Sequence, residues 1–181
     1  MLLPEVLEFG KNLTNTNNTP LSLLNTPYLI SISFMAQVKS DALVFYGATG
    51  DLAFKKIFPA LQMMVQRGNL SVPIIGVARG DYDLEKLKSR AKESIQKHGD
   101  FTEESFQKFA DLLGFVGGDY TDPETFKRIR EAIGEAKNPT HYLAIPPVLF
   151  PKIIEQLDLS GCAKGARVIV EKPFGTDFES A

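Results

Sequence analysis

The sequence predicts an α/β fold, a doubly wound parallel sheet covered by helices on both faces. Short apolar runs of strand length alternate with longer segments in which apolar residues recur at helical spacing. The short runs are apolar throughout, which is typical of parallel strands buried on both faces. Several of these runs end in glycine, proline or charged residues, and ligands of such sheets bind at these strand ends.

The first strand, helix and second strand follow one another without a long loop. Residues 42–46 (Ala-Leu-Val-Phe-Tyr) form a compact run rich in β-formers, which ends at Gly47. Apolar residues at helical spacing over 52–65 predict the next helix, and Gly68 supplies a stop signal. Residues 73–78 (Pro-Ile-Ile-Gly-Val-Ala) predict the second strand.

Two helices are expected before the third strand. Asp83 is a good N-cap for a helix that Gly99 closes, and a further helix begins at Thr102. A short third strand is expected at residues 115–118.

The second half repeats the alternation. Thr121-Asp-Pro-Glu124 has the spacing of a capping box and predicts a helix start. Residues 142–145 predict a strand, and Pro147 suits the first turn of the helix after it. The last strand is expected at residues 167–170. The helix before it should place these residues inward: Phe150, Ile153, Ile154 and Leu157.

Composition excludes several classes of function. The chain has 181 residues, 44% of them hydrophobic, and a net charge of −2, so no basic surface predicts nucleic-acid or membrane binding. The lone Cys162 cannot form an internal disulfide, which suits the reducing cytoplasm, where we expect the protein to reside. His98 and His141 are far apart in sequence, so we expect no metal site.

Residues 1–37 differ from the rest. They are rich in Leu, Asn and Thr, and Glu5 and Glu8 argue against a signal peptide. We interpret residues 1–37 as a disordered or loosely docked leader and residues 38–181 as one domain. An over-extended start, with Met35 as the true first residue, is the alternative.

A glycine-rich turn follows the first strand and opens the first helix. In Gly47-Ala48-Thr-Gly-Asp-Leu-Ala53, Gly47 allows a tight turn, Gly50 leaves room for a pyrophosphate, and Ala53 lets the helix pack closely on the sheet. An anion would face the positive end of the helix. The N–H groups expected to be free for it belong to Thr49, Gly50, Asp51 and Leu52.

Arg79 directly follows the second strand, where this Rossmann-like fold reaches the ribose of adenosine. A cation there accommodates a 2′-phosphate, whereas an acid would bind a free 2′-hydroxyl. The residue therefore favours NADP over NAD, although Asp81 lies nearby and Arg79 could simply point to solvent.

Two further motifs lie at later strand ends. Pro146 and Pro147 rigidify the bend after Tyr142-Leu-Ala144-Ile145, as the wall of a nicotinamide site would need. In the last motif, Glu171-Lys172-Pro173-Phe-Gly175, the charges leave a buried strand and the Lys-Pro bond is a candidate cis peptide.

These motifs, with Ala78-Arg79 and Gly118-Asp-Tyr120, occur in the order and spacing of the glucose-6-phosphate dehydrogenase family, which the chain resembles from about Asp41 to its end. The resemblance implies an NADP-dependent oxidation of glucose 6-phosphate to 6-phosphogluconolactone in the pentose phosphate pathway. It implies that Lys172 contacts cofactor and sugar phosphate and that Pro173 is cis. The implied cofactor-binding residues are Gly47, Ala48, Thr49, Gly50, Asp51, Leu52, Arg79, Tyr120, Ala144, Ile145, Pro146, Glu171, Lys172 and Pro173.

The sequence departs from the family in three ways. Phe54 replaces a usual lysine after the turn, and Gly80 replaces a usual serine after Arg79, which weakens the expected 2′-phosphate clamp. The family's catalytic histidine lies in an Arg-Ile-Asp-His-Tyr-Leu-Gly-Lys-Glu segment that this sequence lacks. We therefore expect no catalytic residue, no sugar-binding and oligomer-forming domain, a fold incomplete relative to the full enzyme, and no activity from the chain alone.

Alternatives remain at this stage. The chain could be a non-catalytic NADP-binding fragment or a degenerate protein. A short-chain reductase or epimerase would use a Tyr-x-x-x-Lys pair, which Tyr82 and Lys86 spell, but directly after the second strand. Sugar oxidoreductases with their own Glu-Lys-Pro motif would want a third glycine at Ala53.

Overall fold

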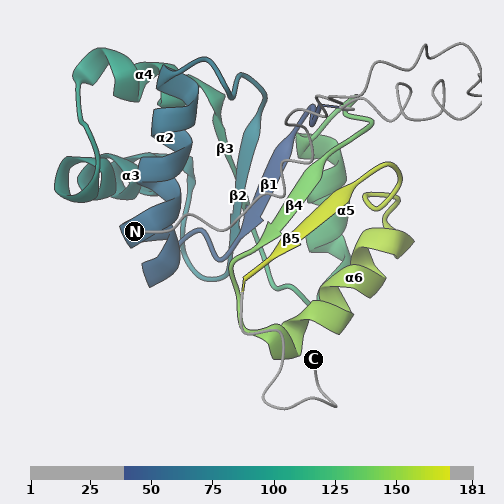
Figure 1. The fold of residues 1–181 in the computed structure, drawn as a ribbon. Coiled ribbons are helices and arrows are strands. Elements are labelled where there is room, and N and C mark those ends of the chain that lie inside the picture. Colours follow the sequence, from purple (N-terminus) through teal and green to yellow (C-terminus); the bar gives the residue numbers. More distant parts are fainter. Residues whose placement is uncertain (1–38, 172–181) are drawn as a thin grey trace, which may run out of the picture. The chain divides into compact units, whose positions relative to one another are not determined.

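The computed structural model describes residues 39–171, in which five strands form one parallel sheet in the order β3–β2–β1–β4–β5 (Figure 1). These are the first five positions of the 3-2-1-4-5-6 order of dinucleotide-binding folds, so the Rossmann-like doubly wound prediction is confirmed. The strands are β1 (Leu43–Tyr46), β2 (Ile74–Ala78), β3 (Leu113–Gly117), β4 (Thr140–Leu143) and β5 (Arg167–Val170).

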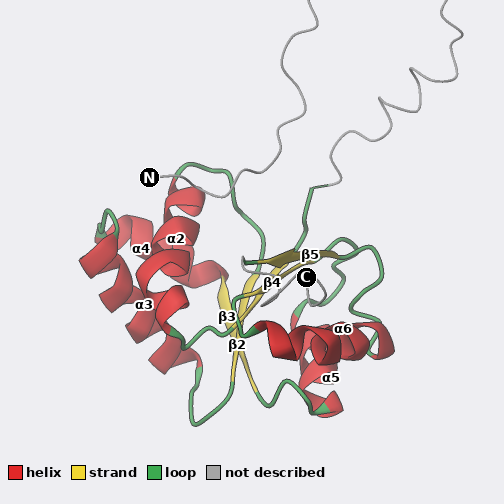
Figure 2. Cartoon of the chain, turned by 60° about the horizontal axis from the view of Figure 1, so that its bottom comes forward, coloured by secondary structure: helices red, strands yellow, loops and turns green. Residues whose placement is uncertain are grey.

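Helices lie on both faces of the sheet (Figures 1 and 2). Helices α2 and α3 cover one face, with α4 packed against α2, while α5 and α6 cover the other. No helix in the described range is long and apolar enough to cross a bilayer. The helices are η1 (Ala53–Ile57), α2 (Phe58–Gln66), α3 (Leu84–His98), α4 (Glu103–Leu112), α5 (Pro123–Ala132), η2 (Pro147–Leu149) and α6 (Phe150–Leu159).

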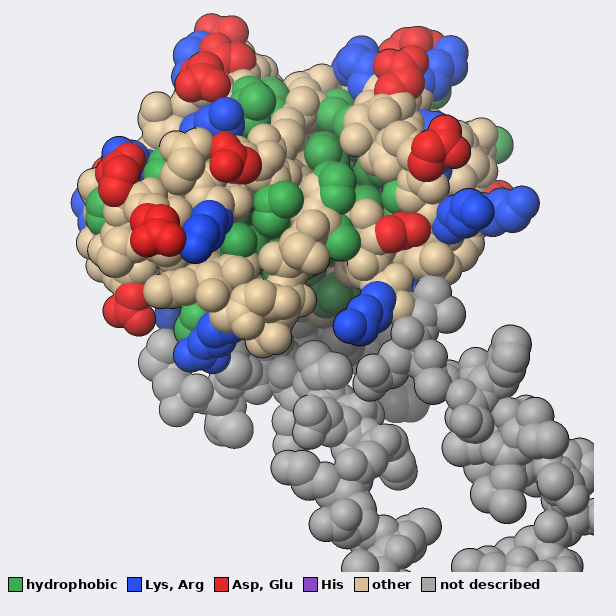
Figure 3. All heavy atoms as spheres, turned by 90° about the horizontal axis from the view of Figure 1, so that it is seen from above, with side chains coloured by type: hydrophobic (Ala, Val, Ile, Leu, Met, Phe, Trp, Pro, Cys, Tyr) green, Lys and Arg blue, Asp and Glu red, His purple; other side chains and the backbone are tan. Residues whose placement is uncertain are grey.

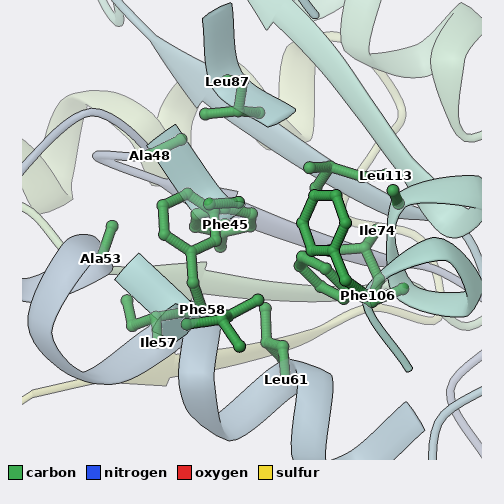
Figure 4. Packing of buried hydrophobic residues seen from close by; sticks show 14 of the residues in the cluster. Phe45, Ala48, Ala53, Ile57, Phe58, Leu61, Ile74, Leu87, Phe106 and Leu113 are labelled. Atoms are coloured by element: carbon green, nitrogen blue, oxygen red, sulfur yellow. The ribbon is translucent and has the colours of Figure 1, made fainter. Parts of the chain in front are cut away.

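A hydrophobic core lies on each face of the sheet. Strand β1 contributes side chains to both cores because its residues alternate between the two faces. Phe45 packs edge-on against Phe58 of α2, with ring centroids 5.7 Å apart, in the core below α2 and α3 (Figure 4). Val44 and Tyr46 point to the opposite core, where Tyr46 stacks on Phe126 of α5. The expected burial on both faces is therefore found in β1, whose last three residues are fully buried.

The first helix begins with a π-helical turn, η1, which the sequence pattern did not predict. The Phe58 N–H bonds to the Ala53 carbonyl, five residues back. Pro59 follows at once and lacks the N–H that would bond to Lys55 in an α-helix. The wider turn absorbs this proline, which would otherwise kink or break the helix.

The fourth strand lies two residues earlier than expected. Its Thr140 pairs with Leu43 and its Leu143 with Tyr46, so β4 ends level with β1. Ala144 and Ile145, expected in the strand, instead form the bend below it. The sheet register thus overrides the local apolar pattern. The third strand begins earlier for the same reason, with Leu113 opposite Ile74.

Two helix predictions were wrong in detail. Asp122, not Thr121, caps α5: its carboxylate accepts from the Glu124 N–H at 3.0 Å, while the Thr121 hydroxyl donates to Asp119. In α6, Ile154 is 44% exposed and Gln156 is buried, because the face that packs on the sheet is made by residues at i, i+3 and i+4: Ile153, Gln156 and Leu157.

Candidate cofactor site

The predicted site residues within the described range lie at the carboxyl edge of the sheet. The chain crosses from β1 to β2 on one side and returns to β4 on the other, so the ends of β1 and β4 form the switch point of the fold. Ligands of doubly wound folds bind in the crevice at this point. Figure 2 is turned so that this edge comes forward.

At Gly47 the two halves of the sheet approach each other closely. Its φ is +83°, which favours glycine, and a Cβ there would lie 2.3 Å from the Ala144 carbonyl oxygen and 3.2 Å from the Ile145 side chain. Only glycine therefore fits both the backbone conformation and the space. The first predicted glycine role, a tight turn out of β1, agrees with this geometry.

Gly50 opens the helix that follows the turn. Its carbonyl accepts from the Phe54 N–H at 3.1 Å, so the N–H groups of Asp51, Leu52 and Ala53 precede the first helical bond. A Cβ at Gly50 would meet only the Gly47 carbonyl, at 3.2 Å, and would otherwise fill open space where a phosphate could sit. The expectation that the Gly50 N–H is free was wrong, because it bonds to Gly47 at 2.9 Å.

The Tyr120 hydroxyl stabilises this turn through two hydrogen bonds. The side chain is only 5% exposed, and its hydroxyl accepts from the Gly47 N–H at 3.0 Å and donates to the Val77 carbonyl at 3.2 Å. Burial raises the pKa of the hydroxyl. The hydroxyl therefore acts inside the protein, fixing the turn between β1 and β2.

Arg79 stands at the end of β2 with its side chain 59% exposed. Its guanidinium carbon lies 5.5 Å from the centre of the Tyr120 ring, and one terminal nitrogen is 3.5 Å from the Asp119 carboxylate. Hydrogen bonds from Thr121, and less strongly the charge of Arg79, lower the pKa of Asp119. Arg79 is thus oriented at the edge, with enough exposure to reach an anion.

Gly80 follows Arg79 with φ +94° and no atom near the position of a Cβ. The Tyr82 N–H bonds back to Gly80 at 3.0 Å, which closes a tight turn. Lys86 donates to the Asp81 carbonyl at 2.9 Å. The Lys86 ammonium group is therefore held by the loop backbone. The short-chain alternative requires it to pair with Tyr82 instead.

The second half of the edge is made by β4 and β5. The bend of Ala144, Ile145 and Pro146 runs beneath Gly47 and continues into η2, where the Leu149 N–H bonds to Pro146 at 3.0 Å. The Tyr142 hydroxyl donates to the Glu171 carboxylate, and burial together with this carboxylate raises the pKa of Tyr142. Lys172 and Pro173, predicted to complete the site, lie outside the described residues, as does the leader.

The two histidines lie away from this edge. His141 is fully buried in β4, between the Tyr46 hydroxyl and the Cys162 carbonyl, and burial lowers its pKa to about 4. His98 ends α3. The part of the chain that the structure describes holds no group of His, Cys, Asp and Glu arranged to bind a metal ion.

The opposite edge carries a hollow of about 470 Å³, which includes Arg130, Lys137 and Lys164 in its lining. Arg130 lies in the last turn of α5, where it complements the negative end of the helix dipole, and it donates to the Gly134 carbonyl. Seen from above, Lys/Arg and Asp/Glu side chains are interspersed on the molecule (Figure 3).

A comparison with family models decides the identity of the domain. The model described as glucose-6-phosphate dehydrogenase, NAD binding domain, matches residues 44–181. The chain belongs to this family.

Individual members of the glucose-6-phosphate dehydrogenase family agree. Glucose-6-phosphate 1-dehydrogenase 1 of Mycobacterium tuberculosis is 42% identical over 142 residues, and cytoplasmic glucose-6-phosphate 1-dehydrogenase 5 of Arabidopsis thaliana is 32% identical over 183 residues. These matches cover 78% and 88% of this chain but only 30% and 35% of the relatives. The chain thus spans about a third of their length.

Solved structures of family members share the fold. The glucose-6-phosphate 1-dehydrogenase of Mycobacterium avium superposes with a TM-score of 0.75 at 44% identity, covering 78% of this chain and 31% of that one. A glucose-6-phosphate dehydrogenase in complex with glucose 6-phosphate superposes with a TM-score of 0.70 at 30% identity, covering 79% of this chain and 32% of that one.

Sequence reasoning missed one contact at the site. Arg90, in the middle of α3, lies over the ring of Phe54 and reaches the Gly50 carbonyl. The periodicity of α3 marks its buried face but does not show which exposed residue meets the turn of another element. The replacement of a lysine by Phe54 was the one available signal.

Proposed function

We propose that this domain binds NADP across the ends of β1, β2 and β4, as the cofactor-binding part of a glucose-6-phosphate 1-dehydrogenase. The observation that carries the proposal is the close approach of Gly47 to Ala144 at the switch point of the sheet, together with the open space beside Gly50. The backbone around Gly50 suits a group that is planar or compact and negatively charged, as a pyrophosphate is. The family membership supports the same assignment.

The edge supplies a distinct contact for each part of the cofactor. Thr49, Asp51 and Leu52 would bind the pyrophosphate through their N–H groups, in the turn that Gly47, Ala48 and Gly50 shape. Arg79 would bind the 2′-phosphate, and Tyr120 would hold Arg79 and the turn in register. The bend of Ala144, Ile145 and Pro146 would lie beside the nicotinamide. Glu171, Lys172 and Pro173 would close the site at the end of β5.

The cofactor would accept a hydride from the sugar, and the protein would orient the two reactants. Lys172 would contact the sugar phosphate as well as the cofactor. The oxidation also needs a group that removes the hydroxyl proton. Within residues 39–171 neither histidine can do so, since His141 is buried and His98 lies at the end of α3.

We further propose that glucose 6-phosphate oxidation, cytoplasmic residence and homo-oligomer formation belong to the full-length relatives. Their remaining two thirds would supply the proton acceptor, most of the sugar site and the oligomer interface. This chain alone would bind NADP without turnover. The rival, an active chain, predicts NADP reduction on addition of glucose 6-phosphate.

Binding is tested by titrating the 181-residue chain with NADP and with NAD, following melting temperature and calorimetric heat. We expect NADP to bind more tightly than NAD, and Arg79→Gln to remove most of that difference while leaving NAD binding unchanged. Lys108→Gln, which removes an exposed charge on α4, far from the carboxyl edge of the sheet (Figure 1), is the control. Failure of both dinucleotides to raise the melting temperature at millimolar concentration would refute the proposal.

A further inference from the structure

Arg90 and Phe54 form a contact at the phosphate turn that the family motifs do not explain. The guanidinium carbon of Arg90 lies 4.8 Å from the centre of the Phe54 ring, and a terminal nitrogen lies 3.4 Å from the Gly50 carbonyl oxygen. Gly50 is the residue at which the helix after the turn begins. The contact thus joins the middle of α3 to the start of the proposed pyrophosphate site.

Arg90 differs from the other cations of α3 in its charge partners. Each of the four lysines of α3 is paired with a carboxylate, at 2.6 to 3.6 Å: Lys86, Lys88, Lys92 and Lys97. Across residues 39–171, Arg90 makes no ion pair. The nearby Glu93 bonds to Lys97, which is the main cause of its lowered pKa, with a smaller contribution from Arg90.

The polar atoms of Arg90 are also incompletely satisfied. Its Nε is buried and has no hydrogen-bond partner in the described part of the chain. Its bond to Gly50 is long and shares a carbonyl that already accepts from Phe54. A guanidinium binds phosphate best through two parallel N–H groups, and a donor left unpaired is costly. The side chain is therefore positioned but lacks an acceptor.

Phe54 explains how Arg90 comes to lie there. The ring is half-buried at the base of the turn, where His98 packs edge-on against it and Lys97 lies 5.6 Å from its centre. Ser94 fixes the backbone by donating to the Phe54 carbonyl. The aromatic face holds a planar cation close without an ion pair to a carboxylate. Phe54 thus stands where the family usually has a lysine, and its ring holds the Arg90 guanidinium beside the turn.

The position of Arg90 indicates which phosphate it would serve. Arg90 also lines a hollow of about 600 Å³ formed by the loop after Arg79 and the first half of α3, together with Lys86 and four carboxylates, those of Asp81, Asp83, Glu85 and Glu93. Three of these carboxylates are paired with lysines, and that of Asp83 caps α3. That loop follows the strand end that reaches the adenosine ribose. Gly80, in the same loop, has no side chain to help bind a 2′-phosphate. Arg90 therefore stands between the phosphate turn and the loop that carries Arg79.

We propose that Arg90, held against Phe54, is a second cation for the 2′-phosphate of NADP, completing with Arg79 the clamp that Gly80 leaves open. This inference rests on the proposed binding of NADP at this edge. On binding, Arg90 would exchange its weak bond to Gly50 for a charge-assisted bond to the phosphate.

The test compares two small probes that differ only in the phosphate concerned, adenosine 2′,5′-bisphosphate and adenosine 5′-monophosphate, together with NADP and NAD. In the full chain we expect Arg90→Gln to weaken NADP and the bisphosphate about tenfold and to change NAD and the monophosphate less than twofold. Phe54→Leu, which removes the aromatic face, should weaken the same two ligands to a smaller extent. Lys108→Gln, with the same charge change on α4, should leave all four unaffected.

Equal weakening of NADP and NAD by Arg90→Gln would overturn the assignment to the 2′-phosphate, and no change in either would overturn a role for Arg90 in binding. A melting temperature of each variant within a few degrees of the parent shows that folding is not the cause. If the parent chain binds neither dinucleotide, the proposed function itself fails. Failure of the proposed function is seen in the parent chain, whereas failure of the Arg90 assignment is seen only in the comparison of the variant with a parent that binds.

Discussion

Strands β1 and β5 belong to the same sheet but have different surroundings. β1 pairs with β2 and β4, and Val44, Phe45 and Tyr46 are fully buried. β5 pairs with β4 in the described sheet, and its Val168 and Ile169 are 43% and 47% exposed. In the described sheet β5 is therefore an edge strand with partly exposed apolar side chains. The two strands end in different halves of the proposed site.

This difference matters for the site because each strand positions a motif. The turn after β1 is held by Tyr120, Ala144 and the start of a helix, so its shape is determined by the packed interior. Glu171, after β5, is held by a hydrogen bond from Tyr142. We infer that the pyrophosphate half of the site is built before a ligand arrives. The nicotinamide half depends on a strand with one described neighbour.

The largest test of the packed half is Gly47→Ala. The new Cβ would lie 2.3 Å from the Ala144 carbonyl at φ +83°, so both steric overlap and backbone strain oppose folding. We expect a loss of about 4 kcal/mol in the free energy of unfolding, measured by urea denaturation, and loss of NADP binding.

Gly68→Ala is the matched control, because Gly68 has φ +72° but no atom within 4 Å of a Cβ. Strain alone should cost about 1 kcal/mol and leave binding intact. Equal losses from the two substitutions would show that Ala144 moves away easily, and that the switch point is not tightly packed.

The second prediction concerns His141, which links β1 to the segment before β5. Its Nε2 must donate to the Cys162 carbonyl, 3.2 Å away, so its Nδ1 can accept from the Tyr46 hydroxyl at 3.3 Å in the neutral form. Burial lowers the pKa from 6.5 to about 4. The unfolded chain therefore takes up the proton first, and the stability held above pH 6.5 falls as the pH falls toward 4.

We expect this group to contribute a loss of about 3 kcal/mol in the free energy of unfolding over that interval. His141→Gln should remove that part of the pH dependence, while His98→Gln, at the end of α3, should leave it unchanged. Denaturation curves at intervals between pH 7 and 4 measure it. An identical slope for His141→Gln and the parent would contradict the assignment.

The sequence predicted the features that local residue types determine, and it missed those that depend on contacts between distant segments. The alternation of apolar runs predicted all five strands, and the glycine turn predicted where the sheet would present its site, because local residue types determine both. The start of β4 was displaced because its register depends on β1, which is distant in sequence. The contact of Arg90 with Phe54 could not be predicted, because it joins residues of two helices whose packing the local pattern does not determine.

The third prediction compares the same substitution, valine to threonine, in β1 and in β5. It replaces one methyl group by a hydroxyl. Val44 and Val168 lie in the same row of the sheet, each opposite His141. Val44→Thr would bury a hydroxyl without a partner and should cost about 2 kcal/mol. Val168→Thr, on the exposed strand, should stay within about 0.5 kcal/mol. Comparable costs, by thermal denaturation, would show that the outer face of β5 is covered in solution.

The smallest expected effect comes from removing one tyrosine hydroxyl in each half of the proposed site, that of Tyr120 near the turn after β1 or that of Tyr142 near the end of β5. Tyr120→Phe removes a buried bond to Gly47 and another to Val77, but Gly47 keeps its own 3.0 Å bond to the Val77 carbonyl. The loss should therefore be only about 1 kcal/mol. Tyr142→Phe releases Glu171 to solvent beside an exposed strand and should cost less than about 0.5 kcal/mol. If Tyr142→Phe cost more than Tyr120→Phe by urea denaturation, the end of β5 would be held as firmly as the turn after β1, and the division of the site into a built half and a dependent half would fail.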